Sequence, residues 1–253
     1  MSWDPRYAAR SPFGETLRTF ARSFVRFAEW PSVVEWDAAF ARGPWADRAA
    51  VRFVPERPRP RRRRATGRAC DPDALYDARI VAGEVPSRER SWHDFLNAHV
   101  WAAFPASKRA LHARQDTMIR ERIGTDRASL PRHRTPEQDA VAMVDEGSVL
   151  LLVPEAERHR VEEALRARAW DTLDALRRGS RIALLVFGHG IHEVQTLAPR
   201  PIEAMAIVLA VDSLPAELDS RLAIADSLLA RRLSSRDRFR APGEHPTFRL
   251  TAR

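Results

Sequence analysis

The sequence contains very little cysteine and lysine. Cys70 is the only cysteine among 253 residues, so the chain can form no internal disulfide and offers no pair of thiolates for a metal or for thiol exchange. Lys108 is the only lysine, and every other basic residue among the 42 is an arginine. Such a bias is typical of a GC-rich genome, and by itself it does not indicate phosphate binding.

Long apolar segments are also missing. The longest apolar run, Ala204 to Val211, stops at Asp212 and is far shorter than the roughly 20 residues needed to cross a bilayer. Charged residues such as Arg6 and Arg10 interrupt the N-terminal region, where a secretory signal would need a continuous apolar segment. We therefore expect a soluble, cytoplasmic protein with no membrane partner.

Several widespread functional motifs are absent from the chain. It has no Gly-x-x-x-x-Gly-Lys-Ser/Thr loop, no Gly-x-Gly-x-x-Gly fingerprint, no Gly-x-Ser-x-Gly elbow and no Cys-x-x-Cys pair. Nucleotide-dependent, lipase-like and zinc-ribbon functions therefore lose the sequence signals that usually support them.

The positive charge is concentrated in one segment. The chain carries a net charge of +8, and seven arginines with no acidic residue lie between Arg57 and Arg68, so the remainder has a net charge of only +1. Proline and clustered like charge disfavour a helix or a central strand here, which predicts an exposed loop over residues 56–69. The loop can contact nucleic acid or an acidic partner, or it can have no function.

The apolar patterning predicts an α+β fold in a single domain covering residues 1–253, with N-terminal helices and a helical hairpin packed on a small mixed sheet with flanking helices. Residues 140–144 and 149–153 indicate a β-hairpin, although a short helix before the turn is an alternative. The expected helices are 13–30, 33–41, 91–104, 105–115, 155–178, a short one from Gly190, and 215–233, and the other expected strands are 51–55, 182–187 and 204–211.

The first candidate functional segment lies at the start of the helical hairpin. His93 and Asn97 are four residues apart and share one helix face, so an imidazole and an amide can reach one substrate or ion. Asp94 stands three residues after Ser91, in a pattern that resembles a capping box. The alternative is architectural: Asp94 caps the helix, and the other two satisfy buried polar groups.

Two further candidates lie in the C-terminal half. Asp145 and Glu146 sit in the predicted turn, where carboxylates can bind a hard cation or act as bases, although turns also favour aspartate for local hydrogen bonds. His189 lies between two glycines after an apolar strand, where a helix begins. Glu193 follows one turn later and can orient its imidazole, while a capping role for His189 is the simpler alternative.

The order of these motifs resembles a bacterial family of uncharacterised proteins, DUF3025. The landmarks are Val51-Arg-Phe-Val-Pro, Tyr76-Asp-Ala-Arg-Ile, Val85-Pro-Ser-Arg, Trp92-His-Asp-Phe-Leu-Asn, Val100-Trp-Ala-Ala-Phe-Pro-Ala-Ser-Lys, Gln138-Asp-Ala-Val-Ala-Met-Val-Asp-Glu and Phe187-Gly-His. The resemblance implies one family domain but no activity. The arginine-rich tract looks like an insertion relative to this pattern.

The leading hypothesis is an enzyme with a His/Asp/Glu site that performs hydrolysis or a related acid/base reaction, with a divalent metal as the candidate cofactor and His93 and His189 as candidate ligands. The expected catalytic residues are His93, Asp94, Asn97, Asp145, Glu146 and His189, and the expected substrate-binding residues are Trp92, Trp101, Lys108 and Arg109. The rivals are a non-catalytic protein that binds through Arg57–Arg68, and a scaffold whose motif residues only hold the hairpin to the sheet.

Overall fold

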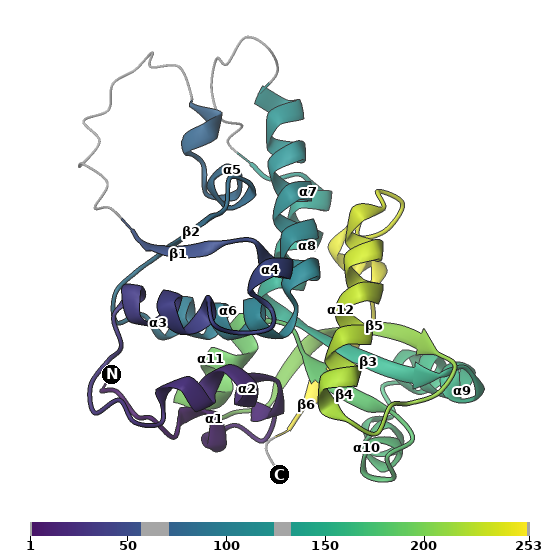
Figure 1. Ribbon diagram of the computed structural model, residues 1–253. Coiled ribbons are helices and arrows are strands. Elements are labelled where there is room, and N and C mark those ends of the chain that lie inside the picture. Colours follow the sequence, from purple (N-terminus) through teal and green to yellow (C-terminus); the bar gives the residue numbers. More distant parts are fainter. Residues whose placement is uncertain (1, 57–70, 124–132, 252–253) are drawn as a thin grey trace.

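The computed structural model describes residues 2–56, 71–123 and 133–251, and within them it confirms the predicted α+β class. Figure 1 shows the N-terminal segments and α6 on one side of the molecule and the larger sheet on the other. The strands are β1 (Arg52–Pro55), β2 (Glu84–Ser87), β3 (Ser148–Pro154), β4 (Ala183–Val186), β5 (Ile202–Val211) and β6 (Thr247–Leu250). The longer helices are α3 (Val33–Phe40), α6 (Trp92–Ala103), α7 (Pro105–Ile123), α8 (Pro136–Gly147), α9 (Glu155–Arg166), α10 (Trp170–Arg178), α11 (His189–Leu197) and α12 (Leu218–Ser234).

The larger sheet is mixed, as predicted. Its strand order is β4-β3-β5-β6, with β3 parallel to β5 and the two outer pairs antiparallel. Leu150 and Leu152 pack on one face with α12, whereas Val149 and Leu151 pack on the other with α9 and α10 (Figure 1). Because both faces are covered, β3 is apolar along almost its whole length instead of alternating.

A second hydrophobic core, rich in aromatic residues, is formed by the N-terminal segments and α6. Phe95 of α6 is fully buried and contacts the rings of Trp36, Phe24 and Tyr7, among others. The predicted continuous helix over residues 13–30 is wrong. The chain forms short turns, η1 (Gly14–Leu17), α2 (Arg18–Ala21) and η2 (Arg22–Phe24), following α1 (Tyr7–Arg10). The chain follows these short turns instead of one regular helix because this path buries several aromatic side chains against α6.

The helical hairpin forms where the sequence places it. The Ser91 hydroxyl accepts the Asp94 backbone N–H at the start of α6, and Pro105 begins α7, which continues beyond the expected end to Ile123. The start of α7 is capped from outside the hairpin, because the buried Asp226 carboxylate of α12 accepts the backbone N–H groups of Ala106 and Ser107. The hairpin is therefore fixed against α12 as well as by its own turn.

The predicted β-hairpin over residues 140–153 is wrong, and the helical alternative holds for its first half. Thr135 and Gln138 form a capping box around Pro136, so a helix begins here and runs directly into β3. Strand β3 then pairs with β4, which follows it only after α9 and α10, and with β5. The predicted helix 155–178 is also divided, because Arg168 adopts a positive φ of 55° between α9 and α10.

The remaining predictions agree with the structure to within a few residues at the ends. The expected helices 33–41 and 215–233 correspond to α3 and α12, and the expected strands 51–55, 182–187 and 204–211 correspond to β1, β4 and β5. Strand β2 was not predicted, and it pairs in parallel with β1. The smaller elements are α4 (Ala46–Ala49), η3 (Pro72–Ala74), α5 (Tyr76–Val81) and η4 (Pro242–Glu244). Among the described helices, none is long and apolar enough to span a membrane.

Candidate functional site

Two connections between a helix and a strand meet at one end of the larger sheet. Helix α8 ends where β3 begins, and β4 ends where α11 begins. Antiparallel pairing sets Val149 opposite Val186, and the backbone N–H groups of Phe187 and Gly188 both donate to the Ser148 carbonyl. This pairing brings Glu146, at the end of α8, beside His189, at the start of α11.

Gly188 permits this close approach. A Cβ atom at Gly188 would lie 2.6 Å from the Glu146 carbonyl oxygen and 2.7 Å from the Ser148 nitrogen, and one at Gly190 would lie 2.9 Å from the same carbonyl. Gly188 has an ordinary φ of −62°. The glycine is therefore required by space and not by backbone conformation.

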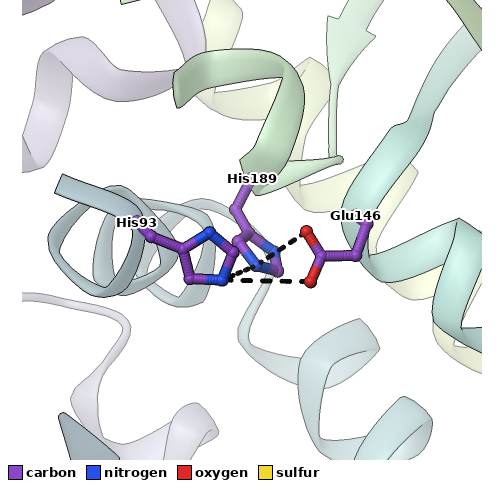
Figure 2. A group of neighbouring side chains, drawn as sticks. All are labelled: His93, Glu146 and His189. Atoms are coloured by element: carbon purple, nitrogen blue, oxygen red, sulfur yellow. Dashed lines mark hydrogen bonds and ion pairs between the residues drawn. The ribbon is translucent and has the colours of Figure 1, made fainter. Parts of the chain in front are cut away.

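Three polar side chains converge at this junction from α6, α8 and α11 (Figure 2). The Nε2 atoms of His93 and His189 are 3.0 Å apart. One carboxylate oxygen of Glu146 lies 3.3 Å from Nε2 of His189, and the other lies 3.9 Å from Nε2 of His93. A hydrogen bond donated by the His189 ring, when its Nε2 carries a proton, lowers the pKa of Glu146 from its usual value. A glutamate carboxylate at its usual pKa is in any case ionised at neutral pH.

The other nitrogen of each imidazole, Nδ1, already has a hydrogen-bond partner. Nδ1 of His93 lies 3.0 Å from the Glu193 carboxylate, and Nδ1 of His189 lies 2.8 Å from the Asp145 carbonyl. Both partners are acceptors, which assigns a proton to each Nδ1. In the neutral rings, the two Nε2 atoms then carry lone pairs only 3.0 Å apart, and a cation or a proton between them relieves their repulsion.

The spacing of the three donors fits a metal ion. Four ligands in a tetrahedron about 2.0–2.1 Å from zinc are about 3.3 Å from one another, and the observed separations of 3.0, 3.3 and 3.9 Å bracket that value. The ligand atoms of His93, Glu146 and His189 all lie within 4.8 Å of one another. In metal sites, the imidazole nitrogen that does not bind the metal usually donates a hydrogen bond to an acceptor, and Nδ1 of both rings has such an acceptor here.

A buried ion pair supports the end of α8. Lys108 of α7 is fully buried, and its ammonium donates a hydrogen bond to the Asp145 carboxylate. Burial alone would raise the pKa of Asp145, but the Lys108 ammonium and the His189 ring outweigh it and hold the pKa below its usual range. The backbone carbonyl of the same residue holds His189, so the ion pair fixes the segment that orients this imidazole.

The cluster opens into a pocket of about 210 Å³. All six residues that the sequence indicated as catalytic line it, and the structure adds four more: one after β1, one at the start of α5, one in β2 and one after β2. The lining residues are Glu56, Tyr76, Pro86, Arg88, His93, Asp94, Asn97, Asp145, Glu146 and His189.

The four residues expected to bind substrate do not line the pocket. Trp92 stacks on Trp3 in the aromatic core, and Trp101 is fully buried against the ring of His112. Lys108 is committed to Asp145, and Arg109 donates to the Ala49 carbonyl. These side chains support the architecture around the pocket.

Asp94 and Glu193 have different partners from those expected. The Asp94 carboxylate does not complete a capping box; it accepts hydrogen bonds from the backbone and the guanidinium of Arg88. Glu193 does orient an imidazole, but it is that of His93 on α6 and not that of His189 one turn away. Sequence spacing could not reveal either pairing, since each depends on how the neighbouring segments pack.

The arginine-rich tract, Arg57 to Arg68, lies outside the described residues, as does Cys70. The exposed loop predicted over 56–69, and its binding of nucleic acid or an acidic partner, therefore stay predictions.

Comparison with known proteins supports one assignment. A family model described as "Protein of unknown function (DUF3025)" matches residues 65–246, a range that includes every residue of the His93, Glu146 and His189 cluster and its supporting partners. No curated protein and no solved structure shows a significant match. Because the match covers well over half of the chain, the protein belongs to the DUF3025 family.

Proposed function

We propose that the protein is a metal-dependent hydrolase whose divalent ion is held by His93, His189 and Glu146. One observation carries the proposal: both Nδ1 atoms are bonded to acceptors, which leaves two Nε2 lone pairs close to each other and to the Glu146 carboxylate. Two imidazoles and one glutamate form a ligand set used by catalytic zinc, which keeps a further position open.

The pocket beside the cluster supports catalysis over a purely structural ion. Structural zinc sites are closed by four protein ligands, whereas the described residues here supply three, and all three line the pocket. An ion bound there supplies a Lewis acid and lowers the pKa of a coordinated water to about 7. The chain itself supplies orientation: Glu193 and the Asp145 carbonyl hold the two rings, and Lys108 holds Asp145.

Metal content provides the direct test. We expect purified protein dialysed against zinc to retain about one ion per chain, measured by inductively coupled plasma mass spectrometry, and His93→Ala, His189→Ala and Glu146→Gln to retain little. His159→Ala is the matched control, because His159 is exposed on α9 and lies outside the cluster. If the wild type retains no more metal than the three variants, the two imidazoles share a proton instead, and the proposal fails.

Glu193 gives a second, graded prediction. Glu193→Gln should keep the fold but weaken zinc binding by about 10–100-fold, since losing a carboxylate behind a ligating imidazole typically has that effect. Competition with a fluorescent zinc chelator measures the change. Glu203→Gln is the control, because Glu203 forms an exposed ion pair with Arg168 and does not line the pocket. Unchanged affinity in Glu193→Gln would show that His93 is not a ligand oriented in this way.

A further inference from the structure

Among the residues that line the pocket, Asn97 alone has a buried polar atom without a hydrogen-bond partner in the described part of the chain. Only 6% of Asn97 is exposed, and its Oδ1 atom is buried without a hydrogen-bond partner among the described residues. An unsatisfied buried acceptor costs about 1–3 kcal/mol. Since Asn97 lies one turn after His93 on α6 and lines the pocket, a ligand in the pocket can supply the missing donor.

Four other polar groups of the pocket already have partners, and Oδ1 of Asn97 differs from them. The Nδ1 atoms of His93 and His189 have their acceptors, and the carboxylates of Asp94 and Asp145 have Arg88 and Lys108. Oδ1 of Asn97 still lacks a hydrogen-bond donor, and an N–H group of a ligand can supply one.

Tyr76 supplies the complementary donor. It lines the same pocket, and burial together with the carboxylates of Asp145 and Asp94 raises the pKa of its phenol well above the usual value. The hydroxyl therefore remains protonated near neutral pH and can donate a hydrogen bond. The pocket thus combines an acceptor on α6 with a donor on α5.

The charges of the pocket disfavour an anionic substrate. Among the described lining residues, Arg88 is the only lysine or arginine, and its guanidinium is bound to Asp94. Lys108 is buried behind the wall and bound to Asp145. Recognition of a phosphate or carboxylate usually uses such cations in charge-assisted hydrogen bonds, and here they are occupied.

We propose that the substrate is a small carboxamide whose N–H donates to Oδ1 of Asn97 and whose carbonyl accepts from the hydroxyl of Tyr76. This inference rests on the proposed hydrolase function. In the reaction, the oxygen of water forms a bond to the acyl carbon and the C–N bond breaks. The nitrogen takes up a proton from the water, so the products are a carboxylic acid and an amine.

Two hydroxamates that differ only in their N–H group test the acceptor. Acetohydroxamate has this donor, whereas N-methylacetohydroxamate lacks it, and both can ligate zinc. We expect the zinc-loaded wild type to bind acetohydroxamate at least tenfold more tightly in calorimetry. Asn97→Leu, which keeps similar volume without the amide, should bind the two within about twofold of each other. If the methyl group were excluded only by its size, Asn97→Leu would still discriminate, and the proposed hydrogen bond would be refuted.

Tyr76→Phe tests the donor. Because both hydroxamates retain the carbonyl, the substitution should weaken the binding of both to the same extent. An unchanged affinity would contradict the role of Tyr76. Inorganic phosphate is the competing probe, and tighter binding of phosphate than of acetohydroxamate would overturn the carboxamide assignment.

Zinc content, measured first, separates the two proposals. A wild type that binds no zinc overturns both, whereas a zinc-loaded wild type that treats the hydroxamates alike overturns only the carboxamide pocket.

Discussion

Replacing Lys108 with methionine should lower the free energy of unfolding by about 3–5 kcal/mol, because breaking a buried ion pair from one side leaves an uncompensated charge. The Lys108 ammonium is fully buried and bonded to Asp145, whose own side chain is only 15% exposed. Methionine fills the space of the aliphatic stem without supplying the charge. Urea unfolding followed by circular dichroism measures the loss.

Two further variants show whether the loss comes from the unpaired charge. Lys108→Met combined with Asp145→Asn removes both charges and should recover a large part of the stability, because the carboxylate no longer lacks a partner. Arg158→Met is the matched control: it removes exposed ion pairs on α9, worth well under about 1 kcal/mol. If the double variant is as unstable as Lys108→Met alone, the lysine contributes packing and not charge.

Gly188→Ala should disrupt the proposed metal site and the fold together. The added methyl would lie 2.6 Å from the Glu146 carbonyl and 2.7 Å from the Ser148 nitrogen, and both are backbone atoms that cannot rotate away. Relieving the clash must separate the start of α11 from the end of α8, at a cost of about 1–3 kcal/mol, typical of overpacking. Because His189 and Glu146 move apart in that adjustment, we expect at least a tenfold loss of zinc affinity, measured by chelator competition.

Gly147→Ala is the matched control for this experiment. Gly147 is adjacent to Glu146 and closes α8, yet a Cβ atom there meets nothing within 4 Å. Its substitution should leave both stability and zinc affinity nearly unchanged. If the two alanine variants behave alike, the close contact at Gly188 does not determine the geometry of the site.

Local signals in the sequence were sufficient for much of the secondary structure. Ser91 and Pro105 mark the starts of α6 and α7, and both helices form where these residues place them. Such capping signals act within one turn, so no tertiary contact is needed to recognise them. The signal failed at residues 140–153, where Asp145 to Ser148 resembles a hairpin turn but ends a helix.

The site could be predicted as a set of residues but not as an arrangement. His93, Glu146 and His189 stood out because imidazoles and carboxylates suit acid/base and metal chemistry, and the structure brings them together from three helices. The partners behind them depend on long-range packing: Glu193 reaches across to α6, and Lys108 reaches from α7 to Asp145. The proposed contribution of Tyr76 likewise becomes visible only once this residue, at the start of α5, lines the same pocket as residues of α6 and α8.

The scarcity of cysteine can be interpreted from the sequence alone, whereas the role of the single lysine depends on the tertiary structure. The sequence by itself determined that the chain forms no internal disulfide and offers no pair of thiolates to a metal, that its charge is concentrated in one tract, and which side chains carry reactive groups. Only the tertiary structure decided that the single lysine is a buried partner of Asp145 and that two histidines almost 100 residues apart face each other at 3.0 Å. The physical reason is that residue chemistry and helix capping are local properties, whereas strand pairing and helix packing join segments that are distant in the sequence.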